Sequence, residues 1–144
     1  MSKLAFIFPG QGAQKAGMGK DFYENSEAAR SFFDQAQKIL DFDLKEMCFG
    51  EHEELNLTEY TQPCMVSVCL AIVQELKKRG INPDITAGLS LGEYAAVAAA
   101  DGMNELDAIK LVRRRGILMQ STVPAGEGAM AAVLGLDAKK IEEI

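Results

Sequence analysis

The sequence lacks several features, and each absence argues against a class of protein. No apolar run approaches the ~20 residues of a membrane-spanning helix, and the run at residues 4–8 is too short for a signal-peptide core. Cys48, Cys64 and Cys69 have no metal-ligand spacing. Positive charge is also scarce: the net charge of −6 argues against a nucleic-acid binder. We therefore expect a cytoplasmic protein with no metal and no membrane or nucleic-acid partner.

The apolar content of 48% and the charged content of 25% are typical of a globular domain. Short apolar runs predict three strands, at residues 4–8, 85–88 and 129–134. Helical patterns predict four longer helices, at residues 27–40, 61–80, 93–100 and 105–121. The alternation of these elements predicts an α/β fold with a parallel sheet.

Local signals define some helix ends. Ser26 is placed to cap the helix at residues 27–40, and Asp43 with Glu46 forms a capping pair for a short helix that Gly50 ends. Residues 51–60 are polar, and we expect a loop there.

The pentapeptide Gly88-Leu89-Ser90-Leu91-Gly92 reads G-x-S-x-G, between a predicted strand and a predicted helix. This is the context of a nucleophile elbow, in which glycines relieve a tight turn and the serine Oγ points outward. The first free N–H groups of the helix then face any negative charge that develops beside the serine. We predict that Ser90 is a catalytic nucleophile. The alternative is an ordinary turn with a capping serine.

Residues 10–17 form a glycine-rich loop after the first predicted strand. One use for such a loop is to bind phosphate, but this loop lacks the spacing of a phosphate-binding motif. Another use is to form part of an oxyanion hole, whose donors would be the N–H of Leu91, just after the nucleophile, and the N–H of a residue in this loop. Gln11 is the natural candidate for the second donor. The alternative is an ordinary flexible loop.

The helix at residues 105–121 contains three consecutive arginines. At 100° per residue, Arg115 falls in the middle of the apolar face, whereas Arg113 and Arg114 fall toward the side of Lys110. We expect Arg113 and Arg114 to be solvated and Arg115 to point inward. An inward arginine needs a carboxylate partner, either from the protein or from a substrate.

Motifs spread over nearly the whole chain resemble those of the malonyl-CoA:acyl carrier protein transacylase family, the acyltransferases of fatty acid and polyketide synthesis. The matching strings are Phe8-Pro9-Gly10-Gln11-Gly12-Ala13-Gln14, Tyr60-Thr61-Gln62-Pro63, Gly88-Leu89-Ser90-Leu91-Gly92-Glu93-Tyr94, Arg115-Gly116 with Met119-Gln120, and Pro124 through Gly128-Ala129-Met130-Ala131-Ala132.

The resemblance implies a hydrolase-like core and a small ferredoxin-like subdomain. It also implies that malonyl passes from coenzyme A through an acyl ester on Ser90 to the phosphopantetheine thiol of acyl carrier protein. Gln11 and Leu91 would donate backbone N–H groups to the oxyanion, and Arg115 would hold the malonyl carboxylate. No permanently bound cofactor is implied.

Two departures stand out. Leu89 occupies a position where the family usually has histidine, which removes one polar group near the site and leaves the exact acyl preference open. The only histidine of this chain, His52, lies in an acidic segment before Ser90, so it is a poor candidate for the base that activates serine. The resemblance places the base beyond residue 144.

We therefore expect an N-terminal part of such an enzyme, with residues 1–127 in the core and residues 128–144 opening the subdomain. This part alone is expected to be inactive and to associate through an unpaired edge at residues 129–134.

Two alternatives belong to other classes. A serine hydrolase of the thioesterase or patatin-like kind would pair the same elbow with Asp101. A non-catalytic fragment would bind coenzyme A or a partner chain without turnover.

Overall fold

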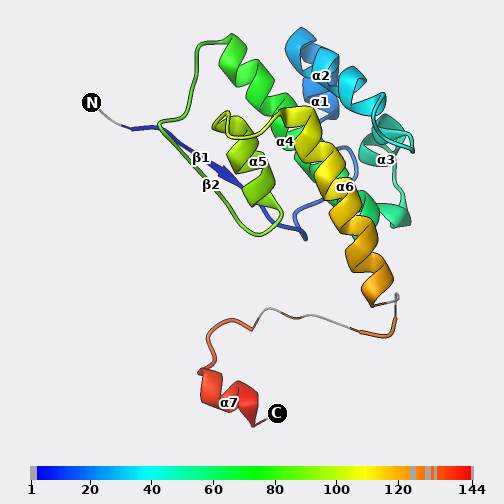
Figure 1. The fold of residues 1–144 in the computed structure, drawn as a ribbon, viewed down its shortest axis with the longest axis vertical. Coiled ribbons are helices and arrows are strands. Elements are labelled where there is room, and N and C mark those ends of the chain that lie inside the picture. Colours follow the sequence, from blue (N-terminus) through cyan, green and yellow to red (C-terminus); the bar gives the residue numbers. More distant parts are fainter. Residues whose placement is uncertain (1–2, 124–125, 129–130, 132, 144) are drawn as a thin grey trace.

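The computed structural model describes residues 3–123, 126–128, 131 and 133–143. Strands β1 (Ala5–Phe8) and β2 (Ile85–Gly88) pair in parallel, with Ala5 opposite Ile85 and Phe8 opposite Gly88. Parallel strands require a long crossover connection, which here consists of helices (Figure 1). The predicted α/β class is confirmed.

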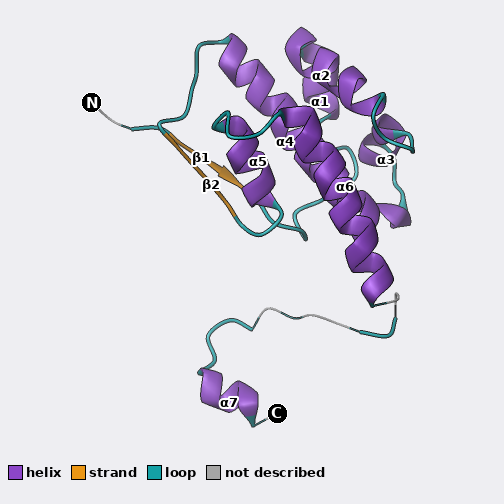
Figure 2. Cartoon of the chain, viewed as in Figure 1, coloured by secondary structure: helices purple, strands orange, loops and turns teal. Residues whose placement is uncertain are grey.

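The helical layer is larger than the sheet (Figure 2). Its elements before β2 are α1 (Lys20–Asn25), α2 (Glu27–Gln37), α3 (Leu44–Phe49), the short 3₁₀ helix η1 (Glu53–Asn56) and α4 (Thr58–Lys78). Those after β2 are α5 (Gly92–Ala99), α6 (Glu105–Thr122) and α7 (Ala138–Glu142). The central helix is α4, which packs against α2, α5 and α6, whereas α7 lies apart from this body (Figure 1).

The core is built around α4, as its nearly continuous apolar surface requires. The largest fully buried apolar side chains of the core include Phe33, Leu44, Val66, Leu70, Leu91, Ile109 and Val112. The sheet is covered less completely than the core, as the exposed fractions of Ile7 (78%) and Ile85 (55%) show. Within the described ranges, no helix combines the length and apolar character that crossing a bilayer requires.

The predicted helix caps are present. Ser26 Oγ accepts from Ala29 N at 3.0 Å, and Asp43 Oδ1 accepts from Glu46 N at 2.9 Å. Each cap satisfies an N–H group that has no partner inside its helix.

Two predicted boundaries were wrong. Helix α2 ends at Gln37 instead of residue 40, and α4 begins at Thr58, inside the segment predicted as loop. The start of α4 has a long-range cause, since Thr58 N donates to Gln120 Oε1 of α6 at 3.1 Å. A side chain 62 residues away therefore satisfies an N–H group at the start of this helix.

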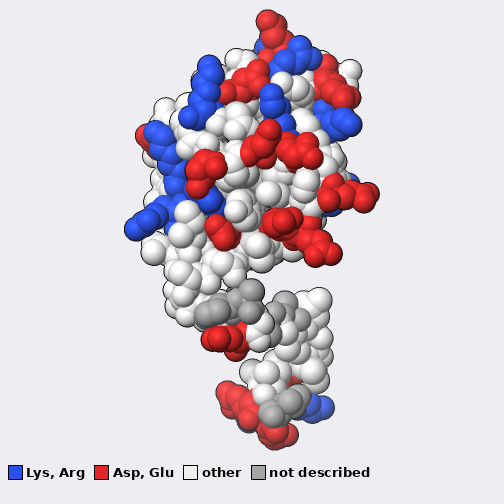
Figure 3. Space-filling view, turned by 90° about the vertical axis from the view of Figure 1, so that its right-hand side faces the viewer, with Lys and Arg blue, Asp and Glu red and all other residues white. Residues whose placement is uncertain are grey.

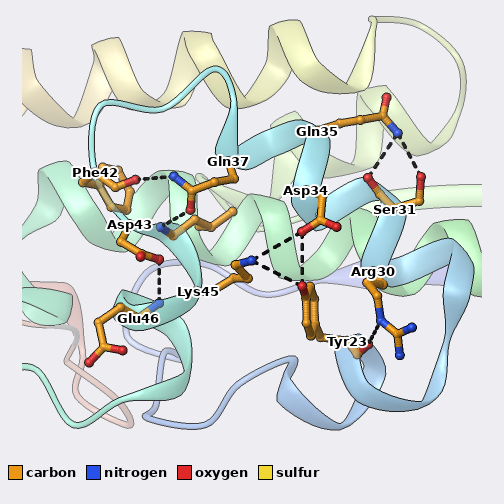
Figure 4. Close-up of polar contacts among 11 residues, drawn as sticks. Tyr23, Arg30, Ser31, Asp34, Gln35, Gln37, Phe42, Asp43, Lys45 and Glu46 are labelled. Carbon is orange, nitrogen blue, oxygen red and sulfur yellow. Dashed lines mark hydrogen bonds and ion pairs between the residues drawn. The ribbon is translucent and has the colours of Figure 1, made fainter.

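A polar cluster joins α1, α2 and α3 (Figure 4), and these helices lie on the side of the molecule away from the sheet (Figure 1). Tyr23 Oη donates to Asp34 Oδ1 at 3.2 Å, and Lys45 Nζ lies 3.3 Å from Tyr23 Oη and 3.5 Å from Asp34 Oδ1. The face in Figure 3 carries charged side chains of both signs.

The third predicted strand, at residues 129–134, lies partly outside the described residues. Of its members, Ala131, Val133 and Leu134 are described, and these three belong to no helix or strand. The domain boundary between residues 127 and 128 stays a prediction.

Candidate active site

A tight turn connects β2 to α5 and carries Ser90. The backbone of Ser90 has a φ of 50°, in the left-handed region that residues other than glycine seldom occupy. A Cβ atom added to Gly88 would collide with the backbone of Gly92, and one added to Gly92 would collide with the carbonyl of Phe8. The two glycines are therefore required by close backbone contacts. The Ser90 side chain is left exposed to solvent.

The loop that follows β1 lies against this turn. A Cβ atom added to Gly10 would lie 3.0 Å from the carbonyl oxygen of Leu89, so the two backbones are in close contact. In the described part of the chain, neither the N–H of Gln11 nor that of Leu91 makes a backbone hydrogen bond. Neither group is therefore committed to a backbone acceptor; Gln11 is exposed, whereas Leu91 is only 1% exposed.

Helix α6 brings Arg115 to the same place. Arg115 Nη2 donates to Ser90 Oγ over 3.4 Å, and Nη1 donates to Gln62 Oε1 at 2.8 Å. The guanidinium also lies over the ring of Tyr94, 5.6 Å from its centre. Among the described residues, no carboxylate forms an ion pair with Arg115, whose cation is held only by neutral groups.

The prediction for Arg113 was wrong, because this side chain is only 12% exposed. It donates to both oxygens of Asp41, at 2.9 and 3.0 Å, and to the backbone oxygen and Oε2 of Glu59. Its guanidinium also contacts the rings of Phe42 and Tyr60. The Arg113 hydrogen bond lowers the pKa of the Asp41 carboxyl below its ordinary value.

The orientation of α6 explains this error. The buried face of the helix runs over Ala108, Ile109, Val112 and Gly116, whereas Leu111 is 44% exposed. The interior face is therefore rotated toward Arg113 from the position that the apolar pattern indicates.

His52 and Asp101 are held in other interactions. His52 Nε2 lies 3.0 Å from Oε1 of Glu46, which is in the first turn of α3. Asp101 pairs with Lys77 at 2.8 Å and follows the C-terminal end of α5, whereas Ser90 precedes its N-terminal end. The eight residues of α5 span roughly 12 Å, so Asp101 is poorly placed to assist Ser90.

Gln62 is a site residue that the sequence reasoning quoted but gave no role. Its side chain is fully buried in α4, with Nε2 directed at Met119 Sδ and Oε1 at Arg115. A buried amide inside an apolar helix requires a hydrogen-bonding partner, and this signal was present in the sequence. Tyr94, beneath Arg115, offered no comparable signal.

The arrangement suits nucleophilic attack on a substrate that carries a carboxylate. Within the described ranges, it combines an exposed serine, two N–H groups without a backbone acceptor and a guanidinium without a carboxylate partner. The described residues contain no group of three or more His, Cys, Asp or Glu side chains that could hold a metal ion.

Known proteins share this sequence and fold. Residues 5–143 match the model of the acyl transferase domain family. The malonyl CoA-acyl carrier protein transacylase of Bacillus subtilis (strain 168) is 49% identical to this chain over 145 residues, which cover 100% of this chain and 46% of the relative. The chain thus spans about half the length of that relative.

Solved structures agree closely with the fold. Malonyl CoA-acyl carrier protein transacylase from Clostridium perfringens has a TM-score of 0.88 at 43% identity, covering 99% of this chain and 45% of that chain. A malonyl-transacylase in complex with a type II PKS acyl-carrier protein has a TM-score of 0.89 at 40% identity, covering 99% and 47%. The chain therefore belongs to the acyl transferase domain family.

Proposed function

We propose that this chain provides the nucleophile, the oxyanion donors and the carboxylate-binding arginine of a malonyl-CoA:acyl carrier protein transacylase. The observation that carries the proposal is the contact between Arg115 and Ser90, with a neutral amide instead of a carboxylate on the other side of the guanidinium. The names of the relatives, which are malonyl transacylases, support the choice of substrate.

The proposed reaction has two half-reactions. In the first, Ser90 Oγ attacks the thioester carbonyl of malonyl-CoA and loses its proton, the C–S bond breaks, and coenzyme A leaves as the thiol. In the second, the phosphopantetheine thiol of acyl carrier protein attacks the ester and releases Ser90. The N–H groups of Leu91 and Gln11 stabilise both tetrahedral oxyanions, and such a donor is worth about 2.7–4 kcal/mol.

Arg115 selects the acyl group in this proposal. Its 3.4 Å contact with Ser90 is long for a hydrogen bond and can be exchanged for a substrate oxygen. Nη1 would stay bound to Gln62 while the remaining donors bind the free carboxylate of malonyl. Neutral acyl groups would leave these donors without an ionic partner.

A base must take the proton of Ser90, and we propose that it lies outside these 144 residues. His52, the only histidine here, is bound to Glu46. The relative from Bacillus subtilis is about twice as long as this chain, which leaves room for a base in a complete protein. We propose that residues 1–127 belong to the core and residues 128–144 to a second subdomain.

We further propose that acyl carrier protein is the macromolecular partner, which the solved complex of a related malonyl-transacylase supports. A cytoplasmic location fits the three cysteines, all of which are described and free. No permanently bound cofactor is required by this reaction.

The test is mass spectrometry of the protein at its natural length after incubation with malonyl-CoA. We expect one malonyl group on the peptide that contains Ser90, and none in Ser90→Ala. Ser121→Ala, which changes an exposed serine at the end of α6, serves as the matched control and should label normally. An adduct on Ser121 or Cys64, or no adduct at all, would contradict the assignment.

A further inference from the structure

The loop that carries Gln11 is exposed, and side-chain amides tie it to the start of α4. Gln11 Nε2 donates to Thr58 Oγ1 at 2.9 Å, and Gln14 Nε2 donates to Asn56 Oδ1 at 3.1 Å. Gln14 also closes the loop on itself, because its Oε1 accepts from Gly12 N at 2.8 Å. The position of the Gln11 backbone therefore depends on where residues 56–58 lie.

Helix α6 holds Thr58 in place. Gln120 Oε1 accepts from Thr58 N at 3.1 Å. Four residues earlier on α6, a Cβ atom added to Gly116 would lie 2.8 Å from the Thr58 carbonyl oxygen and from the Cα of Glu59, so the two backbones touch. A continuous chain of contacts thus runs from α6 through Thr58 to Gln11.

The same helix carries Arg115, which contacts Ser90. Helix α6 therefore contacts Ser90 directly through Arg115. It also reaches the Gln11 loop indirectly, through Gln120 and Thr58. An oxyanion donor works only when it lies within hydrogen-bonding distance of the developing charge. A shift of Thr58 that moved the N–H of Gln11 would therefore slow the acylation of Ser90.

We propose that Thr58 and Gln120 are positioning residues that hold the backbone N–H of Gln11 in place as an oxyanion donor. The proposal rests on the proposed function and extends it to two residues with no role in binding the substrate. Its signature is a slower acylation of Ser90 with the preference for malonyl over acetyl unchanged, because Arg115 keeps its partner Gln62.

The first test is single-turnover acylation by malonyl-CoA in the protein at its natural length. Thr58→Val keeps the shape of the side chain but removes the acceptor for Gln11. We expect the acylation rate to fall roughly tenfold, less than the 10²–10³-fold for outright loss of a donor, with little change in KM. Thr58→Ser keeps the hydroxyl and should restore most of the rate. The matched control is Thr122→Val, at the exposed end of α6, which should acylate normally.

A second pair of variants tests the proposal if Thr58→Val folds poorly. Gln120→Leu removes the acceptor for Thr58 N and should also slow acylation, whereas Gln120→Glu keeps an acceptor at a helix N-terminus and should be closer to the parent. In a double-mutant cycle, the losses of acylation rate in Thr58→Val and Gln11→Leu should be clearly less than additive. Each variant removes the same hydrogen bond, between Gln11 Nε2 and Thr58 Oγ1.

The results separate this proposal from the proposed function. If Ser90→Ala still accepts malonyl in the same assay, the proposed function is wrong and this proposal falls with it. If Ser90→Ala is inactive while Thr58→Val and Gln120→Leu acylate at the parent rate, the positioning role alone is wrong. Additive losses in the cycle, or a changed preference for malonyl over acetyl in Thr58→Val or Gln120→Leu, would also overturn it.

Discussion

Arg113 and Arg115 lie two residues apart on α6, and their surroundings differ sharply. Arg113 is bound by the carboxylates of Asp41 and Glu59 and is nearly buried. Arg115 is bound by the amide of Gln62 and the hydroxyl of Ser90. No carboxylate of the described residues forms an ion pair with it.

One helix thus holds the same side chain in two different electrostatic settings. The charge of Arg113 is neutralised by the protein, so its contribution is to join α6 to the loop after α2 and to the start of α4. Gln62 instead orients Arg115 without neutralising it, and the positive charge remains available to a ligand.

The largest expected effect is on Arg115. Arg115→Ala should reduce malonyl transfer by about 100-fold, as loss of a charge-assisted hydrogen bond pair implies, and should reduce acetyl transfer much less. Arg115→Lys should rescue only partly, because an ammonium group lacks the bidentate fork. The measurement is kcat/KM for the two acyl-CoA substrates. Equal losses for both would mean that Arg115 is structural, as Arg113 is.

Arg113 should behave in the opposite way. Arg113→Met should lower the free energy of unfolding by about 2 kcal/mol, because it removes hydrogen bonds from two carboxylates. The preference for malonyl over acetyl should stay unchanged. Arg114→Met, at an exposed position on the same helix, is the matched control and should change stability by less than about 0.5 kcal/mol. A shift in acyl preference in Arg113→Met would break the distinction between the two arginines.

The effect of Arg113→Met should also depend on pH. Arg113 lowers the folded-state pKa of Asp41, so the stabilisation is fully present above the unfolded pKa of about 3.9. It is lost as the pH falls through the lower folded value. Urea unfolding at pH 7 and near pH 3 should therefore show a smaller difference between parent and variant at the lower pH. An unchanged difference would show that the carboxylate contributes nothing.

The smallest effect is expected from Gln62→Glu, which gives Arg115 a carboxylate like those around Arg113. An ion pair between Glu and Arg115 would compete with the substrate carboxylate, so we expect malonyl transfer to fall about tenfold. Acetyl transfer should change little. Gln62→Met, which removes the hydrogen bond without adding charge, separates loss of orientation from neutralisation. A malonyl rate in Gln62→Glu equal to that of the parent would show that neutral support of Arg115 is unimportant.

Features set by nearby residues were predictable from the sequence. The caps at Ser26 and Asp43 form between a side chain and a backbone group three residues later. The elbow depends on the local spacing of two glycines around Ser90. The two caps and the contact of Gly88 with Gly92 arise within a few positions, although Gly92 also touches the distant Phe8 of β1.

Features set by distant partners were not predictable in the same way. The start of α4 depends on Gln120, and the burial of Arg113 depends on Asp41, which lies 72 residues away. A single apolar pattern indicates the approximate buried face of a helix, but its final rotation depends on the elements packed against it. Only the tertiary structure places those elements.

The left-handed backbone of Ser90 has a consequence for how this chain can change over generations. A non-glycine residue in that conformation costs roughly 1–2 kcal/mol, a cost that glycine would remove. Stability alone therefore favours losing the hydroxyl at position 90. If Ser90 is the nucleophile, as proposed, a lineage with no need for acyl transfer should lose this serine early, whereas a lineage that depends on the reaction must keep it despite the cost.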